Sequence, residues 1–97
     1  MLKGKERSKL RGLANGLKAQ VQIGKAGLTE NVVKTVDEYL SANELIKVSI
    51  GEGVELDPKK VCNDLAEELN AEYVQAIGRR FVLYRKAKDP AKRKIEL

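Results

Sequence analysis

Apolar residues recur along this chain with two different periods, and the order in which these periods alternate limits the folds open to it. Spacings of three and four residues are typical of an amphipathic helix, whereas alternation or a short continuous apolar run is typical of a strand. In chain order, these patterns predict a helix over residues 5–15, a strand over 21–23, a helix over 29–43, a strand over 45–50, a helix over 57–69, and strands over 72–77 and 80–85.

This order predicts a single α/β domain. Strand–helix–strand units require right-handed crossovers between parallel strands. The last two strands are joined by Gly78-Arg79, which suits a two-residue hairpin turn with glycine first, and such a hairpin is antiparallel. We therefore predict the order α-β-α-β-α-β-β, with a mixed four-stranded sheet and helices packed on it. The length of 97 residues leaves room for one domain only.

The apolar side of each predicted helix identifies residues expected in the core. The first helix carries a stripe of Leu10, Leu13 and Leu17 at helical spacing. In the second helix, Tyr39 and Leu40 belong to the apolar side together with several valines. These side chains are expected to pack on the sheet.

The last residues of the chain differ in composition from the rest. From Ala87 onward the sequence is rich in lysine, contains Pro90 and has few apolar residues. Because such a segment has little apolar surface to bury, we expect a solvated tail. The predicted boundaries are therefore residues 1–86 for the domain and residues 87–97 for a basic C-terminal tail.

Two residue types that many enzymes and metal sites need are scarce. The chain contains no histidine and one cysteine, Cys62. It therefore cannot form a Ser-His-Asp or Cys-His catalytic system, a zinc site with several ligands, or an internal disulfide. Cys62 lies among apolar positions of the third predicted helix, which favours a buried small side chain over a reactive thiol. We expect a protein that is not an enzyme, with no catalytic residue, metal or cofactor.

The sequence lacks the signals that direct a protein into or across a membrane. No apolar run approaches the roughly 18 residues of a membrane span. The basic stretch from Met1 to Arg11 is not followed by the apolar segment that a secretory signal requires. We therefore expect a cytoplasmic protein that does not bind a membrane.

Charge is distributed unevenly along the chain, although the formal net charge is only +5. Residues 1–25 contain seven Lys or Arg and one acid, and residues 79–97 contain eight Lys or Arg and two acids. The middle, residues 26–78, contains four bases and eleven acids. If the two ends meet in the fold, one surface suits a polyanion and another repels it; the alternative is charge scattered over a solvated surface.

Four residues between the first predicted strand and the second helix have the pattern Gly-X-X-Gly. The pattern consists of Gly24, Lys25, Ala26 and Gly27. It places flexible backbone, a mobile cation and the free amides of a helix start next to one another at one point. Phosphate is the natural ligand of such a point, and GXXG loops clamp the nucleic-acid backbone in RNA-binding modules. The pattern also occurs as a simple turn before a helix, so alone it does not decide function.

Basic side chains from three parts of the chain are candidates for surrounding this loop. They are Lys3, Arg7, Arg11 and Lys18 near the first helix, Arg79 and Arg80 at the hairpin, and Lys88, Lys92, Arg93 and Lys94 in the tail. With three tyrosines and one phenylalanine, extensive stacking on bases is not expected, so recognition would rest on shape and phosphates. The predicted RNA-binding residues are Gly24, Lys25, Ala26, Gly27, Arg7, Arg11, Lys18, Arg79 and Arg80.

Four short sequence blocks follow one another along the chain. They are residues 10–14 (LRGLA), 23–29 (IGKAGLT), 44–48 (ELIKV), and 74–79 (VQAIGR) with 82–85 (VLYR). These blocks resemble the CRM domain (chloroplast RNA splicing and ribosome maturation), in particular its stand-alone, bacterial YhbY-like form. The resemblance extends over residues 2–86. It implies a fold similar to the C-terminal domain of translation initiation factor three, and RNA binding through the GxxG loop. It also implies association with precursors of the large ribosomal subunit.

The leading hypothesis is a non-catalytic RNA-binding protein, most simply a monomer, that contacts structured rRNA and assists large-subunit assembly. One alternative is a protein-interaction module whose acidic helical surface docks a basic ribosomal protein. That surface would consist of Glu30, Asp37, Glu38, Asp64, Glu67 and Glu68. Another alternative is duplex DNA binding through the first helix.

Overall fold

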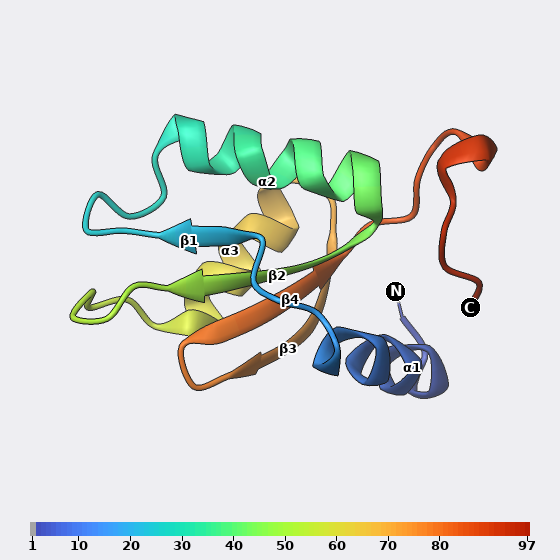
Figure 1. Ribbon diagram of the computed structural model, residues 1–97, viewed down its shortest axis with the longest axis horizontal. Helices are drawn as coiled ribbons and strands as arrows, with labels where there is room; N and C mark the ends of the chain where they lie inside the picture. The colour runs from blue at the N-terminus through green and yellow to red at the C-terminus, as the bar shows by residue number, and fades with distance from the viewer. Residues whose placement is uncertain (1) are drawn as a thin grey trace.

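The helices and strands form close to where the apolar periods predict them. In the computed structural model, which describes residues 2–97, the elements are α1 (Gly4–Asn15), β1 (Val21–Ile23), α2 (Glu30–Asn43), β2 (Leu45–Ile50), α3 (Pro58–Glu68), β3 (Glu72–Ile77), β4 (Arg80–Tyr84) and the 3-10 helix η1 (Pro90–Lys92). Figure 1 shows the strands in the middle of the molecule, with α2 above them and α1 below. Within this described range, no helix has the length and apolar character needed to cross a membrane.

Local signals at the helix starts explain these boundaries. The Thr29 hydroxyl accepts a hydrogen bond from the Val32 N–H at 3.2 Å, and the Asp57 carboxylate accepts one from the Lys59 N–H at 3.1 Å. Each capping oxygen supplies an acceptor that the first turn of a helix lacks. Pro58 follows Asp57 at the start of α3, where its missing N–H removes no helical hydrogen bond.

The sheet has the strand order β1-β2-β4-β3. β1 lies parallel to β2, whereas β4 lies antiparallel to both β2 and β3, so the predicted mixed sheet is confirmed. The last strand of the chain therefore occupies a central position. Gly78 opens the β3–β4 turn with a φ of +60°, a left-handed conformation that glycine adopts without strain. A shift in register between Tyr73 and Gln75 marks a bulge in β3.

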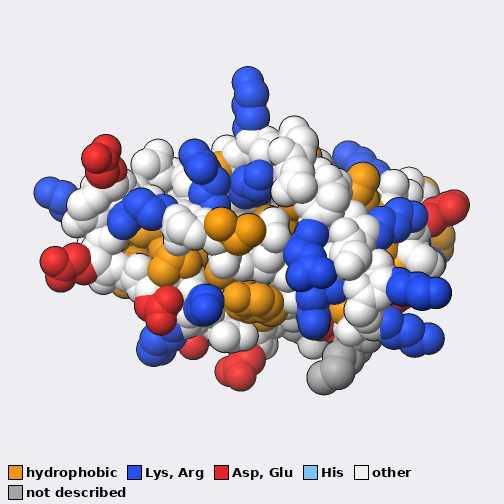
Figure 2. Space-filling model, turned by 90° about the horizontal axis from the view of Figure 1, so that it is seen from below, with side chains coloured by type: hydrophobic (Ala, Val, Ile, Leu, Met, Phe, Trp, Pro, Cys, Tyr) orange, Lys and Arg blue, Asp and Glu red, His pale blue; other side chains and the backbone are white. Residues whose placement is uncertain are grey.

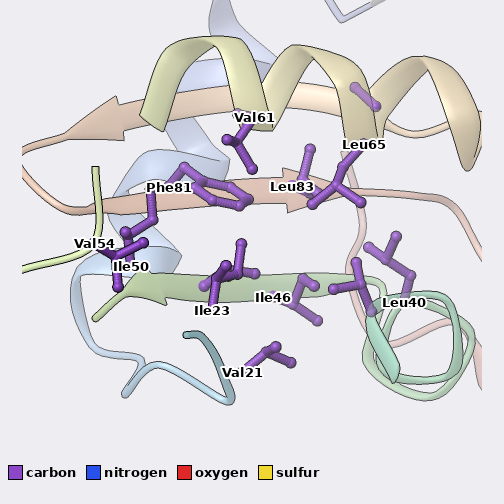
Figure 3. Packing of buried hydrophobic residues seen from close by; sticks show 14 residues of the cluster. Val21, Ile23, Leu40, Ile46, Ile50, Val54, Val61, Leu65, Phe81 and Leu83 are labelled. Carbon is purple, nitrogen blue, oxygen red and sulfur yellow. The ribbon is translucent and has the colours of Figure 1, made fainter. Parts of the chain in front are cut away.

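Two apolar clusters lie on opposite faces of the sheet. The larger cluster joins α2 and α3 to one face, and Figure 3 shows Val61 and Leu65 of α3 pointing toward Phe81 and Leu83 of β4. Cys62 is buried in this cluster, as predicted. The members of the smaller cluster, which joins α1 to the other face, are Leu10, Ala14, Leu45, Val74, Val82 and Tyr84. Successive residues of β4 thus serve the two clusters in turn.

Two residues expected in the core are exposed instead. Leu13 is 45% exposed and Tyr39 is 38% exposed. The contact of α1 with the sheet is narrow and uses Leu10 and Ala14, which lie four residues apart on one side of the helix. In α2, Leu40 is fully buried and Tyr39 lies at the edge of the packed side. The core sides of both helices are therefore narrower than the sequence predicts.

The C-terminal tail is anchored to the domain. Ala87 is buried, and Ile95 packs against the cluster beneath α1. The fully buried carboxylate of Glu44, which follows α2, accepts hydrogen bonds from the main-chain N–H groups of Ala87, Lys94 and Ile95 at 2.8, 2.5 and 3.1 Å. The expectation of a solvated tail is therefore wrong for Ala87 and Ile95, whereas residues 88–94, 96 and 97 are exposed. A buried acceptor orders a segment that has little apolar surface of its own.

Candidate functional site

The residues from Gly24 to Gly27 form an exposed turn directly after β1. The N–H of Gly27 donates to the carbonyl of Gly24 at 3.0 Å, which closes the turn around Lys25 and Ala26. A Cβ added at either glycine would meet no atom within 4 Å, and Gly27 has a φ of +73°. The turn therefore presents main chain to solvent, and no neighbouring group blocks the approach of a ligand to its glycines.

The turn leads directly into α2. The Thr29 N–H donates to the Gly27 carbonyl at 3.0 Å, just before Thr29 caps the helix. The N–H groups of Glu30 and Asn31 belong to the first turn, so they have no acceptor within the helix. The Glu30 carboxylate reduces the positive potential at this helix start. Attraction of an anion to this end must therefore come mainly from Lys25 and from cations on neighbouring elements.

Two other connections lie at the same end of the sheet as this turn (Figure 1). The Gly51 N–H donates to the Ile23 carbonyl at 2.9 Å, which joins the end of β2 to the end of β1. The Ile50 N–H donates to the Arg79 carbonyl at 2.7 Å, which joins β2 to the β3–β4 turn. Open α/β sheets commonly bind ligands at the carboxyl ends of their parallel strands, and this is the end where the three connections meet.

Arg79 fixes the β3–β4 turn to the loop between β2 and α3. Its Nε donates to the Ile50 carbonyl at 3.2 Å, and its Nη2 donates to the carbonyls of Gly51 and Val54, the latter at 2.7 Å. A phosphate contact by Arg79, predicted from the sequence, would compete with these bonds. In the structure, this guanidinium connects the β3–β4 turn to the β2–α3 loop, at the sheet edge beside the Gly24–Gly27 turn.

Arg80 lies on a part of the sheet that α1 does not cover. One row of the sheet register crosses all four strands there, and it consists of Gln22, Ser49, Arg80 and Ile77. Because neighbours of these residues along each strand face the larger cluster, the row faces the opposite side, the side of α1. Ile77 is 68% exposed, and Gln22 and Arg80 are also exposed. This open row offers amide, hydroxyl and guanidinium groups beside the Gly24–Gly27 turn.

The predicted cations near the first helix differ in their exposure. Arg7 is half-buried, and its Nε is buried with no hydrogen-bond partner among residues 2–97. Arg11 is exposed, and its Nη2 donates to the Ser8 hydroxyl at 3.1 Å. Lys18 is exposed in the connection from α1 to β1. Figure 2 shows Lys and Arg side chains distributed along this face, with hydrophobic side chains between them.

The basic tail lies away from the Gly24–Gly27 turn. Figure 1 shows the turn and the C-terminal segment at opposite ends of the molecule, whose longest dimension is 37 Å. The predicted position of the tail lysines around the loop is therefore wrong. The two basic ends of the chain do meet each other, since the Lys9 ammonium donates to the Glu96 carbonyl. Positive charge accordingly extends along the molecule and does not encircle one loop.

Acidic residues gather on the side of the sheet that carries α2 and α3. The carboxylates of these two helices are Glu30, Asp37, Glu38, Asp64, Glu67 and Glu68. Asp37 accepts a hydrogen bond from Arg85 Nη1 at 2.7 Å, and Asp64 pairs with Lys60 at 3.1 Å. With six carboxylates against the three lysines Lys34, Lys59 and Lys60, these two helices give the molecule a net acidic side.

Tyr84 and the single thiol are buried, and Tyr73 is partly buried against the larger cluster. Burial raises the pKa of the hydroxyl groups of Tyr73 and Tyr84. Burial also raises the pKa of the Cys62 thiol to about 12, so this thiol stays protonated at neutral pH. Among residues 2–97, no group of three or more His, Cys, Asp or Glu side chains is placed to hold a metal ion. The exposed chemistry of the candidate site consists of main-chain amides, cations and polar side chains.

Residues 2–85 match the family model of the CRS1 / YhbY (CRM) domain. The chain belongs to the CRM domain family. The matched region of this CRM domain contains the three α-helices, the four strands and the Gly24–Gly27 turn. The resemblance seen in the sequence blocks is therefore confirmed, whereas residues 86–97 lie outside the match.

Relatives of this CRM domain include bacterial proteins named for RNA binding. The probable RNA-binding protein YqeI of Bacillus subtilis (strain 168) is 39% identical over 89 residues, which are 92% of this chain and 93% of that protein. An RNA-binding protein of Haemophilus influenzae is 37% identical over 89 residues, which are 91% of this chain and 89% of that protein. The solution structure of SAV1595, a hypothetical Staphylococcus aureus protein with a suggested RNA-binding function, has 38% identity and a TM-score of 0.80; the similarity covers 99% of this chain and 100% of SAV1595.

Three residues of this CRM domain that shape the candidate surface were not identified from the sequence. Glu44 is the C-cap of α2, directly before the apolar strand β2, and this position alone does not indicate that its carboxylate is buried. Gln22 and Ser49 are polar members of alternating strands. Their alignment with Arg80 depends on strand pairing, which the alternation within each strand does not determine.

Proposed function

We propose that this CRM domain binds structured RNA through its phosphate backbone, with the Gly24–Gly27 turn as the central contact. The observation that carries this proposal is an exposed main-chain turn with open space at both glycines. Phosphate oxygens accept hydrogen bonds from exposed amides, and Lys25 adds a mobile point charge. The names of the curated relatives, which refer to RNA binding, support the same ligand.

The open part of the sheet and α1 extend this contact. Arg80, Arg11 and Lys18 are exposed cations on the same side of the sheet. Gln22 and Ser49 supply polar groups for 2′-hydroxyls or base edges, which phosphate contacts alone do not recognise. These groups are spread over a surface and are not gathered in a pocket, which suits a folded RNA better than a single nucleotide.

The biological role that we infer is assistance to large-subunit assembly without catalysis. The resemblance to stand-alone YhbY-like proteins supports precursors of the large ribosomal subunit as the RNA. Contacts to phosphates, placed to match the shape of the folded RNA, hold an RNA conformation in place. No covalent bond has to be made or broken. One chain supplies the turn, the open sheet and α1, so a monomer is sufficient for this role.

Substitution of Gly24 by Asp tests the turn. The φ of Gly24 lies outside the left-handed region and its added Cβ meets no neighbour, so the variant is expected to fold normally. It places a carboxylate where phosphate is proposed to bind. We expect it to lose binding to fragments of large-subunit rRNA in fluorescence anisotropy. Asn63→Asp, which adds the same charge on the exposed side of α3, is the control and should bind as the natural chain does.

The salt dependence of binding tests the phosphate contacts separately. For an RNA held through Z phosphates of a single strand, log affinity falls against log salt with a slope of about −0.7Z. Lys25→Gln should reduce this slope by about one unit at most. A folded Gly24→Asp protein that binds as tightly as the natural chain would show that the turn is not the RNA contact.

A second candidate function is docking of a basic ribosomal protein, which the acidic side formed by α2 and α3 favours. Co-sedimentation with ribosomal particles after ribonuclease treatment separates the two functions. Release by ribonuclease supports RNA binding, whereas retention supports protein docking. Duplex DNA binding through α1 is tested by competition between matched RNA and DNA, and we expect RNA to compete better because its accessible groove carries 2′-hydroxyls.

A further inference from the structure

The C-terminal segment, which lies outside the region matched to the family, is folded onto the domain through one buried carboxylate. Glu44 is fully buried and accepts hydrogen bonds from three N–H groups of this segment. The Arg93 Nε donates to the Ala87 carbonyl at 2.9 Å, which folds the segment back on itself. A segment rich in lysine therefore has a defined shape, although its composition predicts solvation.

The same segment packs against α1. The Lys9 ammonium donates to the Glu96 carbonyl, 87 positions away in the sequence, and Ile95 packs with Leu2 against the cluster beneath α1. A groove of about 1840 Å³ is lined by α1, the end of α2 and this segment, and the exposed Leu13 is one of its lining residues. The two ends of the chain thus form one continuous surface.

Positive charge dominates the outside of this surface, because its exposed Lys and Arg side chains outnumber its exposed acids, Asp89 and Glu96. The Asp89 carboxylate caps η1 by accepting a hydrogen bond from the Ala91 N–H at 3.0 Å. The Glu44 carboxylate is buried, bonded to main-chain N–H groups and close to Arg93. Five of its exposed cations, which we call the C-terminal basic surface, are Lys9, Lys88, Lys92, Arg93 and Lys94; Lys86 is a further exposed cation beside them.

We propose that the C-terminal basic surface is a second contact for the phosphate backbone of the RNA that the Gly24–Gly27 turn binds. This inference rests on the proposed function. The turn and the surface lie at opposite ends of a molecule 37 Å long, and Figure 2 shows Lys and Arg side chains toward both ends of one face. An RNA that follows this face reaches both contacts, and the second contact then forms at high effective concentration. Glu44 is a positioning residue, since it fixes the cations without facing the RNA.

Three variants separate the charge of this surface from its ordered position. The first replaces Lys88, Lys92 and Lys94 by Gln, which removes three exposed charges and leaves the main-chain bonds to Glu44 in place. The second, Glu44→Ala, keeps every cation of the surface but removes the acceptor that orders the segment. The control replaces Lys34, Lys59 and Lys60 by Gln, which removes the same number of exposed charges from α2 and α3.

Binding to an RNA hairpin from the large-subunit rRNA is measured by anisotropy over a range of salt concentrations. We expect the tail triple variant to bind at least about tenfold more weakly at 0.1 M salt, with a salt slope smaller by about two units. The α2–α3 control should bind within about twofold of the natural chain, because its charges lie on the other side of the sheet. Glu44→Ala should weaken binding several-fold and increase hydrogen exchange of the amides at positions 87, 94 and 95.

Each remaining outcome identifies which proposal fails. Equal weakening by the tail variant and the control would mean that only net charge matters, and would overturn the inference. If the tail variant binds normally while Gly24→Asp does not, the second contact is absent but the proposed function stands. If Gly24→Asp binds normally and the tail variant does not, the turn is wrongly assigned. Should Glu44→Ala fail to fold, the tail variant decides alone, because its substituted side chains are exposed.

Discussion

The guanidinium of Arg79 donates a hydrogen bond to the main-chain carbonyl of Val54 at 2.7 Å, across 25 positions of sequence. This bond ties the tip of the β3–β4 hairpin to the loop that follows β2. The same guanidinium also donates to the main-chain carbonyls of Ile50 and Gly51, so Arg79 holds the loop after β2 against the hairpin. An arginine at a hairpin tip thus acts here as a link between connections.

Replacement of Arg79 by Ala is expected to lower the free energy of unfolding by about 1–2 kcal/mol. The loss arises because main-chain carbonyls lose a charged donor, although water partly replaces it at this exposed turn. Arg79→Lys should recover only part of this loss, since an ammonium cannot reproduce the planar fork of donors. Urea unfolding measures both variants. Arg80→Ala is the matched control, and its free energy of unfolding should lie within about 0.5 kcal/mol of that of the natural chain.

Acidification should weaken the anchor of the C-terminal segment. Burial raises the pKa of Glu44, but the N–H donors of Ala87, Lys94 and Ile95 and the charge of Arg93 outweigh it, so the pKa lies below its ordinary value. A carboxyl group whose pKa is lower in the folded chain stabilises the fold above its unfolded pKa of about 4.3. That contribution is lost as the pH falls through the folded pKa.

The comparison of the natural chain with Glu44→Gln isolates this contribution. At neutral pH the variant should be less stable by about 1–3 kcal/mol, because a buried charged acceptor of several N–H groups becomes a neutral amide. The difference between the two unfolding free energies should shrink below pH 4.3 or so, since Glu44 is then protonated in the unfolded chain. A difference that stays constant from neutral to acidic pH would contradict the assignment of Glu44 as an ionised anchor.

The two glycines of the turn should differ in their effect on stability. Gly27 has a φ of +73°, so Gly27→Ala is expected to cost about 1–2 kcal/mol of unfolding free energy. Gly24 lies outside the left-handed region and its Cβ meets nothing, so Gly24→Ala should be neutral or stabilise by up to about 1 kcal/mol. Thermal unfolding of both variants tests this difference. Equal destabilisation by the two substitutions would show that the turn has another backbone conformation.

The thiol of Cys62 should be protected from modification in the folded protein. It is fully buried, and burial raises its pKa to about 12, so only about one thiol in ten thousand is ionised at pH 8. Labelling with a disulfide reagent such as DTNB should therefore be slow in buffer. In denaturant the same thiol should react at the rate of an ordinary cysteine. Fast labelling of the folded chain would place Cys62 near the surface.

The period of the apolar residues predicts every helix and strand of the domain, because local packing preferences and turn residues agree along the chain. The places where the sequence is insufficient depend on contacts between distant residues. Leu13 has the spacing of a core residue, but α1 covers only part of one sheet face and leaves it exposed. Tyr39 is exposed for a similar reason at the edge of α2. The width of a helix contact is a tertiary property that helical spacing does not contain.

In the candidate site, too, the local features could be predicted from the sequence and the contacts between distant residues could not. The Gly24–Gly27 turn is visible in the sequence because its special residues are consecutive. The bonds of Arg79 to carbonyls, and the capture of the C-terminal segment by Glu44, link residues that are far apart in the sequence. Segregation of charge along the chain predicts a basic side and an acidic side, but it does not predict that the tail and the turn lie at opposite ends.

The central position of β4 has a consequence for synthesis of the protein. This strand is the last of the sheet in chain order, yet it lies between β2 and β3 and contributes side chains to both apolar clusters. A nascent polypeptide therefore cannot complete either cluster until Tyr84 has left the ribosomal exit tunnel. Earlier elements remain without their packing partner during elongation, so we expect the domain to fold late and as one cooperative unit.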